Sequence, residues 1–312
     1  MQLIRDNLDL SNWMGDLEES HAVIPASSWE QGVIDHFHKQ IEVPRLRLPW
    51  MSTHTVFQLR KGEVTLWAGI NGHGKSMITG QALISLCAQN ERVCLASLEM
   101  PPVKTMARMS RQAFGAFEPT IDYIKKFAKW TDGKLWMYDH LGSCKPEIVL
   151  AVIRYAIDNF GITQFFIDNL MKVVAGEDSY NDQKNFVNSL CTIATNTGCH
   201  IHLVLHVKKL KDEESKPNKF DIKGTGAITD LVDNVFIVWR NKKKENALRE
   251  GTDSLPDDPD ALLIIEKQRH ADELDTGSFK LWFDGASMQY LENRYDQPKM
   301  MDVEKFVDDV EF

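Results

Sequence analysis

Residues 62–76 read Gly-Glu-Val-Thr-Leu-Trp-Ala-Gly-Ile-Asn-Gly-His-Gly-Lys-Ser, and this stretch decides the fold. The mostly apolar run over residues 64–68 predicts a buried strand, because such runs need cover on both faces of a sheet. The apolar spacing over residues 77–86 predicts a helix. The stretch therefore predicts a strand, a glycine-rich turn and a helix in succession.

The turn fits the phosphate-loop pattern, with Gly69 and Gly74 separated by four residues and followed by Lys75 and Ser76. Glycines let backbone N–H groups curl around an anion, and the helix N-terminus adds a partial positive charge. The lysine then reaches the β- and γ-phosphates, and the serine hydroxyl binds Mg²⁺. The pattern predicts a site for ATP and Mg²⁺ formed by Gly69, Asn71, Gly72, His73, Gly74, Lys75, Ser76 and Met77.

The composition is that of a soluble globular protein, with 43% hydrophobic and 26% charged residues in 312. A net charge of −9 argues against nucleic acid coating the whole surface, although a local basic patch is compatible with it. The five cysteines include no C-x-x-C pair, which favours reduced thiols in a cytoplasmic protein. We expect no membrane segment and no signal peptide.

Apolar runs that alternate with helical patterns predict an α/β fold with a mainly parallel, twisted sheet and helices on both faces. The helices are expected from residue 102 onward, over 146–160 and over 179–195. Further strands are expected over 92–99, 135–139, 163–169, 200–206, 233–240, 261–268 and 279–283. Sites in such sheets lie at the carboxyl ends of the strands.

Glu99, Asp168 and His206 are each expected to end an apolar strand at that edge. Asp168 is interpreted as the acid that holds Mg²⁺ through water, although an aspartate there can also serve a turn. Glu99 is the candidate base for the attacking water, with helix capping as its alternative role.

His206 closes a run in which alternation places it on the same face as His200 and His202. Three histidines on one face invite a metal site, but no thiol or carboxylate nearby completes a ligand set. We favour instead a sensor of the γ-phosphate at the strand tip.

The segment after His206 is long, polar and rich in lysine, so it is either a solvated loop or a finger that grips a phosphate backbone. The candidate DNA-binding residues are Lys208, Lys209, Lys211, Lys216, Lys219, Lys223, Gly224, Thr225 and Gly226. Lys267 and Arg269 lie at the end of a strand whose residues 262–265 are strongly apolar. They are either solvated or point into the nucleotide site of an adjacent subunit.

Several motifs resemble the hexameric replicative DNA helicases, namely the DnaB-like group, and more closely the helicase half of phage primase-helicases and of mitochondrial Twinkle. His206 stands where bacterial DnaB-like proteins usually have glutamine, which suits the phage and mitochondrial branch. The motifs are 69–76, Ser-Leu-Glu-Met-Pro at 97–101, Ile-Asp-Asn-Leu at 167–170, Leu-His-Val-Lys at 205–208, Gly-Thr-Gly-Ala at 224–227 and Lys-Gln-Arg at 267–269.

The resemblance implies a RecA-like P-loop ATPase core over 42–292 that assembles as a ring around single-stranded DNA and unwinds duplex DNA during replication. It implies Lys75, Glu99, His206 and Arg269 as catalytic residues, Ser76 and Asp168 at the metal, and Lys267 at the neighbour's nucleotide. The alternative is a RecA-like DNA-stimulated ATPase of recombinase or loader type without unwinding.

Two flanking segments complete the expected organisation. In residues 1–41, apolar side chains of Trp29, Val33, Ile34 and Phe37 recur at helical spacing. Such a helix packs either on its own domain or on a neighbouring subunit, and the resemblance implies a linker helix. The acidic tail over 293–312 is either solvated or a docking segment for a DNA polymerase or another replication protein.

Overall fold

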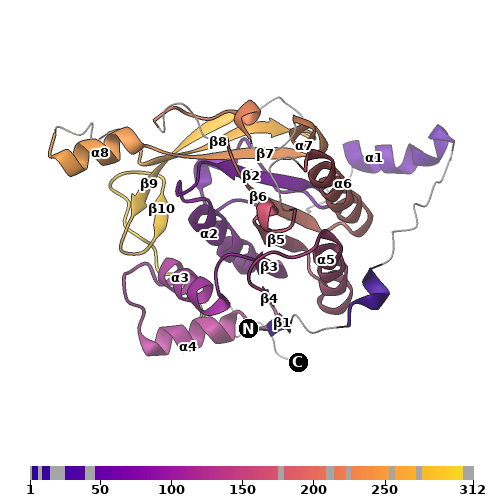
Figure 1. Cartoon of the computed structure of the whole chain (residues 1–312), viewed down its shortest axis with the longest axis horizontal. Helices are drawn as coiled ribbons and strands as arrows, with labels where there is room; N and C mark the ends of the chain where they lie inside the picture. The colour runs from indigo at the N-terminus through magenta and orange to yellow at the C-terminus, as the bar shows by residue number, and fades with distance from the viewer. Residues whose placement is uncertain are drawn as a thin grey trace.

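The computed structural model describes residues 2–5, 9–14, 25–38, 46–174, 179–208, 214–222, 226–252, 257–271 and 276–304. Ten strands of this described part form one sheet, in the order β1-β4-β3-β5-β6-β2-β7-β8-β9-β10 (Figure 1). Neighbouring strands are parallel from β1 to β7 in that order, and β8, β9 and β10 are antiparallel. The predicted mainly parallel sheet is confirmed.

The strands span β1 Gln2–Arg5, β2 Val64–Gly69, β3 Val93–Ser97, β4 Leu135–Asp139, β5 Gln164–Asp168, β6 His200–His206, β7 Asn234–Arg240, β8 Ala261–Gln268, β9 Gly277–Asp284 and β10 Gln289–Leu291. The helices span α1 Glu30–His38, α2 Lys75–Ala88, α3 Pro102–Phe114, α4 Ile121–Trp130, α5 Pro146–Phe160, α6 Tyr180–Thr197, α7 Gly226–Leu231 and α8 Lys242–Glu250. Among the described residues, no helix has both the length and the apolar character needed to cross a membrane.

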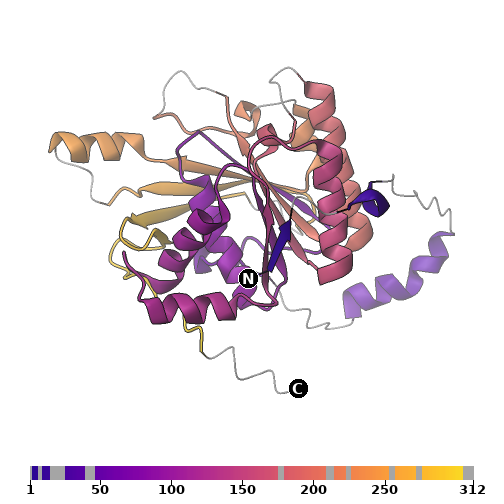
Figure 2. The ribbon, with the colours of Figure 1, turned by 60° about the horizontal axis from the view of Figure 1, so that its bottom comes forward.

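Two apolar layers enclose the sheet, as the alternation along its strands requires. In β6, Leu203 and Leu205 face a core shared with α5, α6 and α7, whereas Val204 faces the core shared with α2, α3 and α4. Figures 1 and 2 show these two groups of helices on opposite faces of the sheet. The predicted cover of both faces is therefore confirmed, and the sheet carries its site at an edge.

The helix α4 was not expected from the sequence, although its start carries a recognisable signal. The Thr120 hydroxyl accepts a hydrogen bond from the backbone N–H of Tyr123, which caps the first turn. Tyr123, Phe127 and Trp130 are buried on one side of the helix. This spacing of three or four residues is the amphipathic pattern that packs α4 against the core it shares with α2, α3 and the sheet.

The start of the expected acidic tail packs on α3 and α4. The backbone N–H of Met301 donates to the Ala113 carbonyl oxygen at 2.7 Å, and Val303 is buried. The Glu304 carboxylate lies 2.6 Å from the Lys126 ammonium. Residues 305–312, which contain the rest of the predicted docking segment, lie outside the described residues.

The apolar residues predicted on an N-terminal helix lie on or beside α1, and they are exposed. Trp29 is 61% exposed and Phe37 is 73% exposed. Val33 and Ile34, which lie between them in the sequence, are exposed as well. A helix that shows its apolar side chains to solvent leaves that surface for another molecule or another copy.

Candidate active site

The phosphate loop joins β2 to α2 with the predicted geometry. Gly72 and Gly74 have φ of +79° and +87°, a region that only glycine enters at low cost. A Cβ on Gly69 would lie 2.5 Å from the Val238 carbonyl oxygen, so the backbone of β7 also requires glycine there. Asn71 and Gly72 are exposed at the tip of the turn, and Met77 is partly buried in α2.

Lys75 lies folded into its own loop. Its ammonium donates to the carbonyl oxygens of Gly69 at 2.9 Å and Ile70 at 3.0 Å, and it lies 3.0 Å from His206 Nδ1. Burial lowers the pKa of Lys75 to about 8, against the opposing effect of Asp168 and Glu99. The side chain is thus a buried cation that lacks a directly bonded anion among the described residues, which suits it to an incoming phosphate.

Ser76 and Asp168 meet at the start of α2, as the predicted metal site requires. The Ser76 hydroxyl donates to Asp168 Oδ2 at 2.7 Å. Burial raises the pKa of Asp168, while the Ser76 hydrogen bond and the Arg108 guanidinium lower it. The Ser76 hydroxyl and the Asp168 carboxylate are hard oxygen donors of the kind that Mg²⁺ prefers. A bound cation would also stabilise the charged form of the buried carboxylate.

The residues expected to act on the γ-phosphate are brought together by Asn169. Its Nδ2 lies 3.0 Å from Glu99 Oε1 and 3.1 Å from His206 Nε2. Glu99 does not end β3 as predicted, because that strand stops at Ser97 and Glu99 lies in the turn that follows. The turn still directs its carboxylate to the tips of β5 and β6.

Asn169 and Arg108 were not predicted as site residues from their side chains. Asn169 is completely buried, and Arg108 reaches the site from α3, about sixty residues before Asp168 along the chain. The signal for Asn169 was its place directly after the strand-end aspartate, inside the Ile-Asp-Asn-Leu motif. Nothing in the local sequence of α3 pointed to Arg108.

His73 has a structural role that the sequence did not reveal. Its side chain is 1% exposed, and Nδ1 accepts a hydrogen bond from the backbone N–H of Arg240 at 3.0 Å. Burial lowers the pKa of His73 to about 4, so the ring is neutral and can accept. His73 therefore ties the phosphate loop to the end of β7.

Lys267 and Arg269 lie at the opposite edge of the sheet from the phosphate loop of the same chain. Gly69 pairs with Val238 near the end of β7, whereas Gln268 pairs with Asn234 at its start. The Lys267 ammonium donates to three carbonyl oxygens, of Thr229, Asp230 and Val232. Arg269 pairs with Asp233 at 3.3 Å and donates to the Asp230 carbonyl. Within one chain these cations do not join the nucleotide residues.

The lysine-rich segment begins directly at His206. Val207 forms a bridge with Ile222, and the Lys208 N–H donates to the Asp221 carbonyl at 2.6 Å, so the two ends of the loop are held together. Lys208 is exposed, Lys219 lies over the exposed ring of Phe220, and Gly226 begins α7. The candidates Lys209, Lys211, Lys223, Gly224 and Thr225 lie outside the described residues.

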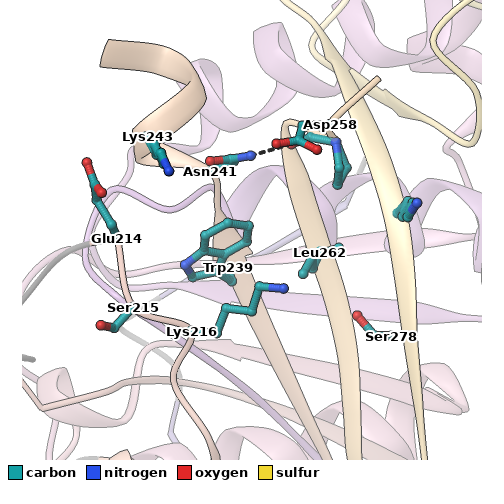
Figure 3. Close-up of a pocket in the computed structure, with 11 residues that line it drawn as sticks. Glu214, Ser215, Lys216, Trp239, Asn241, Lys243, Asp258, Leu262 and Ser278 are labelled. Carbon is teal, nitrogen blue, oxygen red and sulfur yellow. Dashed lines mark hydrogen bonds between the residues drawn. The ribbon is translucent and has the colours of Figure 1, made fainter. Parts of the chain in front are cut away.

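A pocket of about 580 Å³ lies between this loop and strands β7, β8 and β9 (Figure 3). The Lys216 ammonium stands 5.4 Å from the centre of the Trp239 ring in its wall. Its other charged lining residues are of both signs, Lys243 and Lys280 with Glu214 and Asp258, and this mixture selects no class of ligand. The contact does place the middle of the lysine-rich loop, at Lys216, on the sheet.

The histidines of β6 do not form a metal site. His200 is buried and contacts the Thr65 hydroxyl and the Arg60 carbonyl, and His202 contacts Gln164 and the Trp67 indole. Over the ranges that the structure describes, no group of three or more His, Cys, Asp or Glu side chains is arranged for a metal ion. Of the three histidines, His206 at the strand tip is the one that reaches the nucleotide residues.

Comparisons with known proteins agree with this geometry. The family model for the AAA domain matches residues 52–212, just over half of the chain. A DNA helicase/primase of Enterobacteria phage T3 is 25% identical over 206 residues, which cover 59% of this chain and 36% of that protein. The chain thus spans little more than a third of this curated relative.

Solved structures show the same fold. One solved ATPase domain matches with a TM-score of 0.62 at 15% identity, covering 75% of this chain and 86% of that chain. A DnaB-like replicative helicase studied with primase matches with a TM-score of 0.69 at 13% identity, covering 88% and 68%. The predicted RecA-like core and the predicted resemblance to DnaB-like helicases are confirmed, whereas the closeness to mitochondrial Twinkle stays a prediction.

Proposed function

Because this chain belongs to the AAA domain family, we propose that it hydrolyses ATP and uses the energy to move along single-stranded DNA as a ring and unwind duplex DNA. The observation that carries the proposal is the meeting of Lys75, Ser76, Glu99 and Asp168 at one edge of the sheet, with Arg269 at the other edge. One edge holds a phosphate-binding and hydrolytic set. The other holds Arg269, which would act on the nucleotide of a second copy.

The site suits a nucleoside triphosphate with Mg²⁺. The glycine turn offers backbone N–H groups at the start of α2, and Lys75 can leave its carbonyl partners for the phosphates. Ser76 and Asp168 would hold Mg²⁺, which when bound neutralises charge on the phosphates.

Hydrolysis then needs a base and a way to stabilise negative charge. Glu99, whose carboxylate contacts Asn169 at the strand tips, would orient and deprotonate the attacking water. Lys75 and the Arg269 of the next copy are the cations that stabilise charge building on the transferred phosphoryl group. Lys267, beside Arg269, would support the same neighbouring nucleotide.

The separation of the two edges supports a head-to-tail assembly, of which a ring is the closed form. A head-to-tail contact puts one copy's Arg269 edge against the next copy's phosphate loop, and repetition of that contact closes a ring if the rotation allows it. The exposed apolar side chains of α1, such as Trp29 and Phe37, supply a second surface that a neighbouring copy can cover. The resemblance to hexameric helicases favours six copies.

The lysine-rich loop is the proposed DNA contact. It starts at the γ-phosphate sensor His206, so a change at the nucleotide can displace Lys208 and the rest of the loop. Lysines that contact only the phosphates bind DNA irrespective of its base sequence, and this binding weakens as the salt concentration rises. This is the behaviour that a translocating motor needs.

The deciding experiment is strand displacement on a forked duplex, with ATP hydrolysis measured with and without single-stranded DNA. The helicase proposal requires DNA-stimulated hydrolysis and ATP-dependent displacement of the strand. Stimulated hydrolysis without displacement would favour the alternative, a recombinase- or loader-type ATPase. If the protein is strictly monomeric and hydrolyses ATP at the same rate with and without DNA, both the helicase proposal and its alternative are excluded.

The acidic tail is proposed as a docking segment for a replication partner such as a DNA polymerase. Asp302 and Glu304 already lie beside α4, where Glu304 pairs with Lys126. Deletion of residues 305–312 should weaken polymerase binding and leave ATP hydrolysis unchanged. Unchanged polymerase binding would remove this partner from the proposal.

A further inference from the structure

Asn169 occupies a fixed orientation at the tip of β5. It is completely buried, and its Oδ1 accepts a hydrogen bond from the backbone N–H of Met171 at 3.0 Å. That bond assigns the oxygen, so Nδ2 is the group that faces both Glu99 Oε1 and His206 Nε2. The two N–H bonds of one amide thus reach the proposed catalytic base and the proposed phosphate sensor.

His206 lies between two donors. Lys75 Nζ is 3.0 Å from its Nδ1, and Asn169 Nδ2 is 3.1 Å from its Nε2. A neutral imidazole has one acceptor nitrogen and one N–H, so it cannot accept from a charged Lys75 and from Asn169 at the same time. These distances are therefore compatible with two alternative hydrogen-bond arrangements, which differ in the tautomer of His206.

Phosphate binding selects between them. When Lys75 turns from His206 to the phosphates, Nδ1 is released to carry the proton and to donate to an anion. Nε2 then becomes the acceptor for Asn169, and the second N–H of the same amide holds Glu99. A change in the His206 contact therefore acts on the same amide group that holds Glu99, and so bears on the position of the carboxylate.

The same histidine ends β6 and begins the lysine-rich loop. Val207 bridges to Ile222, and Lys208 is bonded to Asp221, so a displacement of the loop reaches His206 through one or two residues. DNA on the loop can therefore alter the His206–Asn169 contact and, through it, the position of Glu99.

We propose that Asn169 is a positioning residue that couples Glu99 to His206, so that phosphate and DNA together set the orientation of the base. The inference rests on the proposed function for its DNA half. Its other half, the orientation of Glu99 by the amide, applies to hydrolysis without DNA as well.

The test compares Asn169→Asp with Asn169→Ala, with Asn188→Asp on the exposed surface of α6 as the matched control. We would measure kcat and KM for ATP between pH 5.5 and 8.5, with and without single-stranded DNA, and the affinity for a nonhydrolysable ATP analogue. Asn169→Asp replaces two N–H donors by a carboxylate that faces Glu99, and it regains an O–H donor only when protonated.

We expect both Asn169 variants to bind the analogue within about twofold of the native protein, since the phosphate loop is untouched. Their kcat with DNA should fall about tenfold or more, as loss of one productive hydrogen bond implies. The ratio of kcat with DNA to kcat without DNA should approach one. In Asn169→Asp, kcat should recover as the pH falls, whereas Asn169→Ala and Asn188→Asp should show no recovery.

Equal losses of kcat with and without DNA, together with no acid recovery in Asn169→Asp, would reduce Asn169 to a packing role and overturn the inference. If the native protein shows no DNA stimulation, the proposed function fails. The acid recovery of basal hydrolysis then still decides the role of Asn169. Should Asn169→Asp lose analogue binding through misfolding, a kcat of Asn169→Ala within about twofold of native, with and without DNA, would overturn the inference.

Discussion

The pKa of Lys75 predicts a dependence of ATP affinity on pH that follows directly from its burial. Without nucleotide this pKa lies at about 8, because the ammonium is buried with only carbonyl oxygens and a histidine as direct partners. A bound phosphate favours the charged form and raises the pKa, so binding requires the proton and takes it up when it is missing. The affinity for ATP must therefore fall as the pH rises through the pKa that Lys75 has in the free protein.

The size of the effect follows from the fraction of protonated Lys75. With a pKa of about 8, roughly one molecule in eleven carries the charge at pH 9, so the apparent Kd should be about tenfold weaker than at pH 7. The phosphates add little in this window, because their last pKa is near 6. Cys191 adds nothing either, since burial raises its pKa to about 11.

The assay is the Kd of a fluorescent nonhydrolysable ATP analogue from pH 7 to 9.5 at constant free Mg²⁺ and ionic strength. Lys75→Arg is the matched control, since a guanidinium keeps its charge throughout this range and its Kd should be flat, whatever its absolute value. A flat Kd in the native protein, or an equal slope in Lys75→Arg, would refute the assignment of the buried cation to phosphate binding.

Further predictions test the catalytic set, the interface, the loop and the core. Glu99→Gln should bind ATP and assemble normally but lose about 10²- to 10⁴-fold in kcat, as removal of a general base implies; retained hydrolysis would move the base elsewhere. Lys75→Ala and Arg269→Ala should each be inactive, and mixed rings should regain hydrolysis because an intact phosphate loop can then face an intact arginine; mixed rings that stay inactive would argue against action between copies. Gly74→Ala should abolish binding of the ATP analogue, since the φ of Gly74 is +87° and a Cβ would lie 2.2 Å from the Tyr290 hydroxyl oxygen. Gly142→Ala is the control for backbone strain alone, because Gly142 has a φ of +100° and open space where a Cβ would lie. Phe165→Ala, at a fully buried ring, should lower the free energy of unfolding by about 3–5 kcal/mol in urea titrations, whereas Phe220→Ala, at a ring that is 78% exposed, should change it by less than about 0.5 kcal/mol.

Local pattern was enough to locate the phosphate loop and most of the sheet. The helix predicted over 146–160 and the strands predicted over 200–206 and 261–268 have those limits in the structure. Apolar spacing and flanking proline or glycine residues specify such elements, because each depends on neighbours within a few positions. The failures were short or marginal elements, such as α4 and β10, whose stability comes from the core they join.

The partners of the site residues needed the tertiary structure. Asn169 contacts Glu99 and His206 across 70 and 37 positions of sequence, and these contacts exist only because β3, β5 and β6 are neighbours in the sheet. The role of His73, which binds the end of β7, became visible in the same way.

The sequence by itself predicted a phosphate loop, a mainly parallel sheet and a set of acids and cations suited to ATP. Only the tertiary structure decided which of these residues share a site, and that Arg269 lies at the far edge from its own phosphate loop. The reason is that strand order and strand direction are set by packing between distant segments, whereas each strand, turn and helix is largely encoded by its own residues.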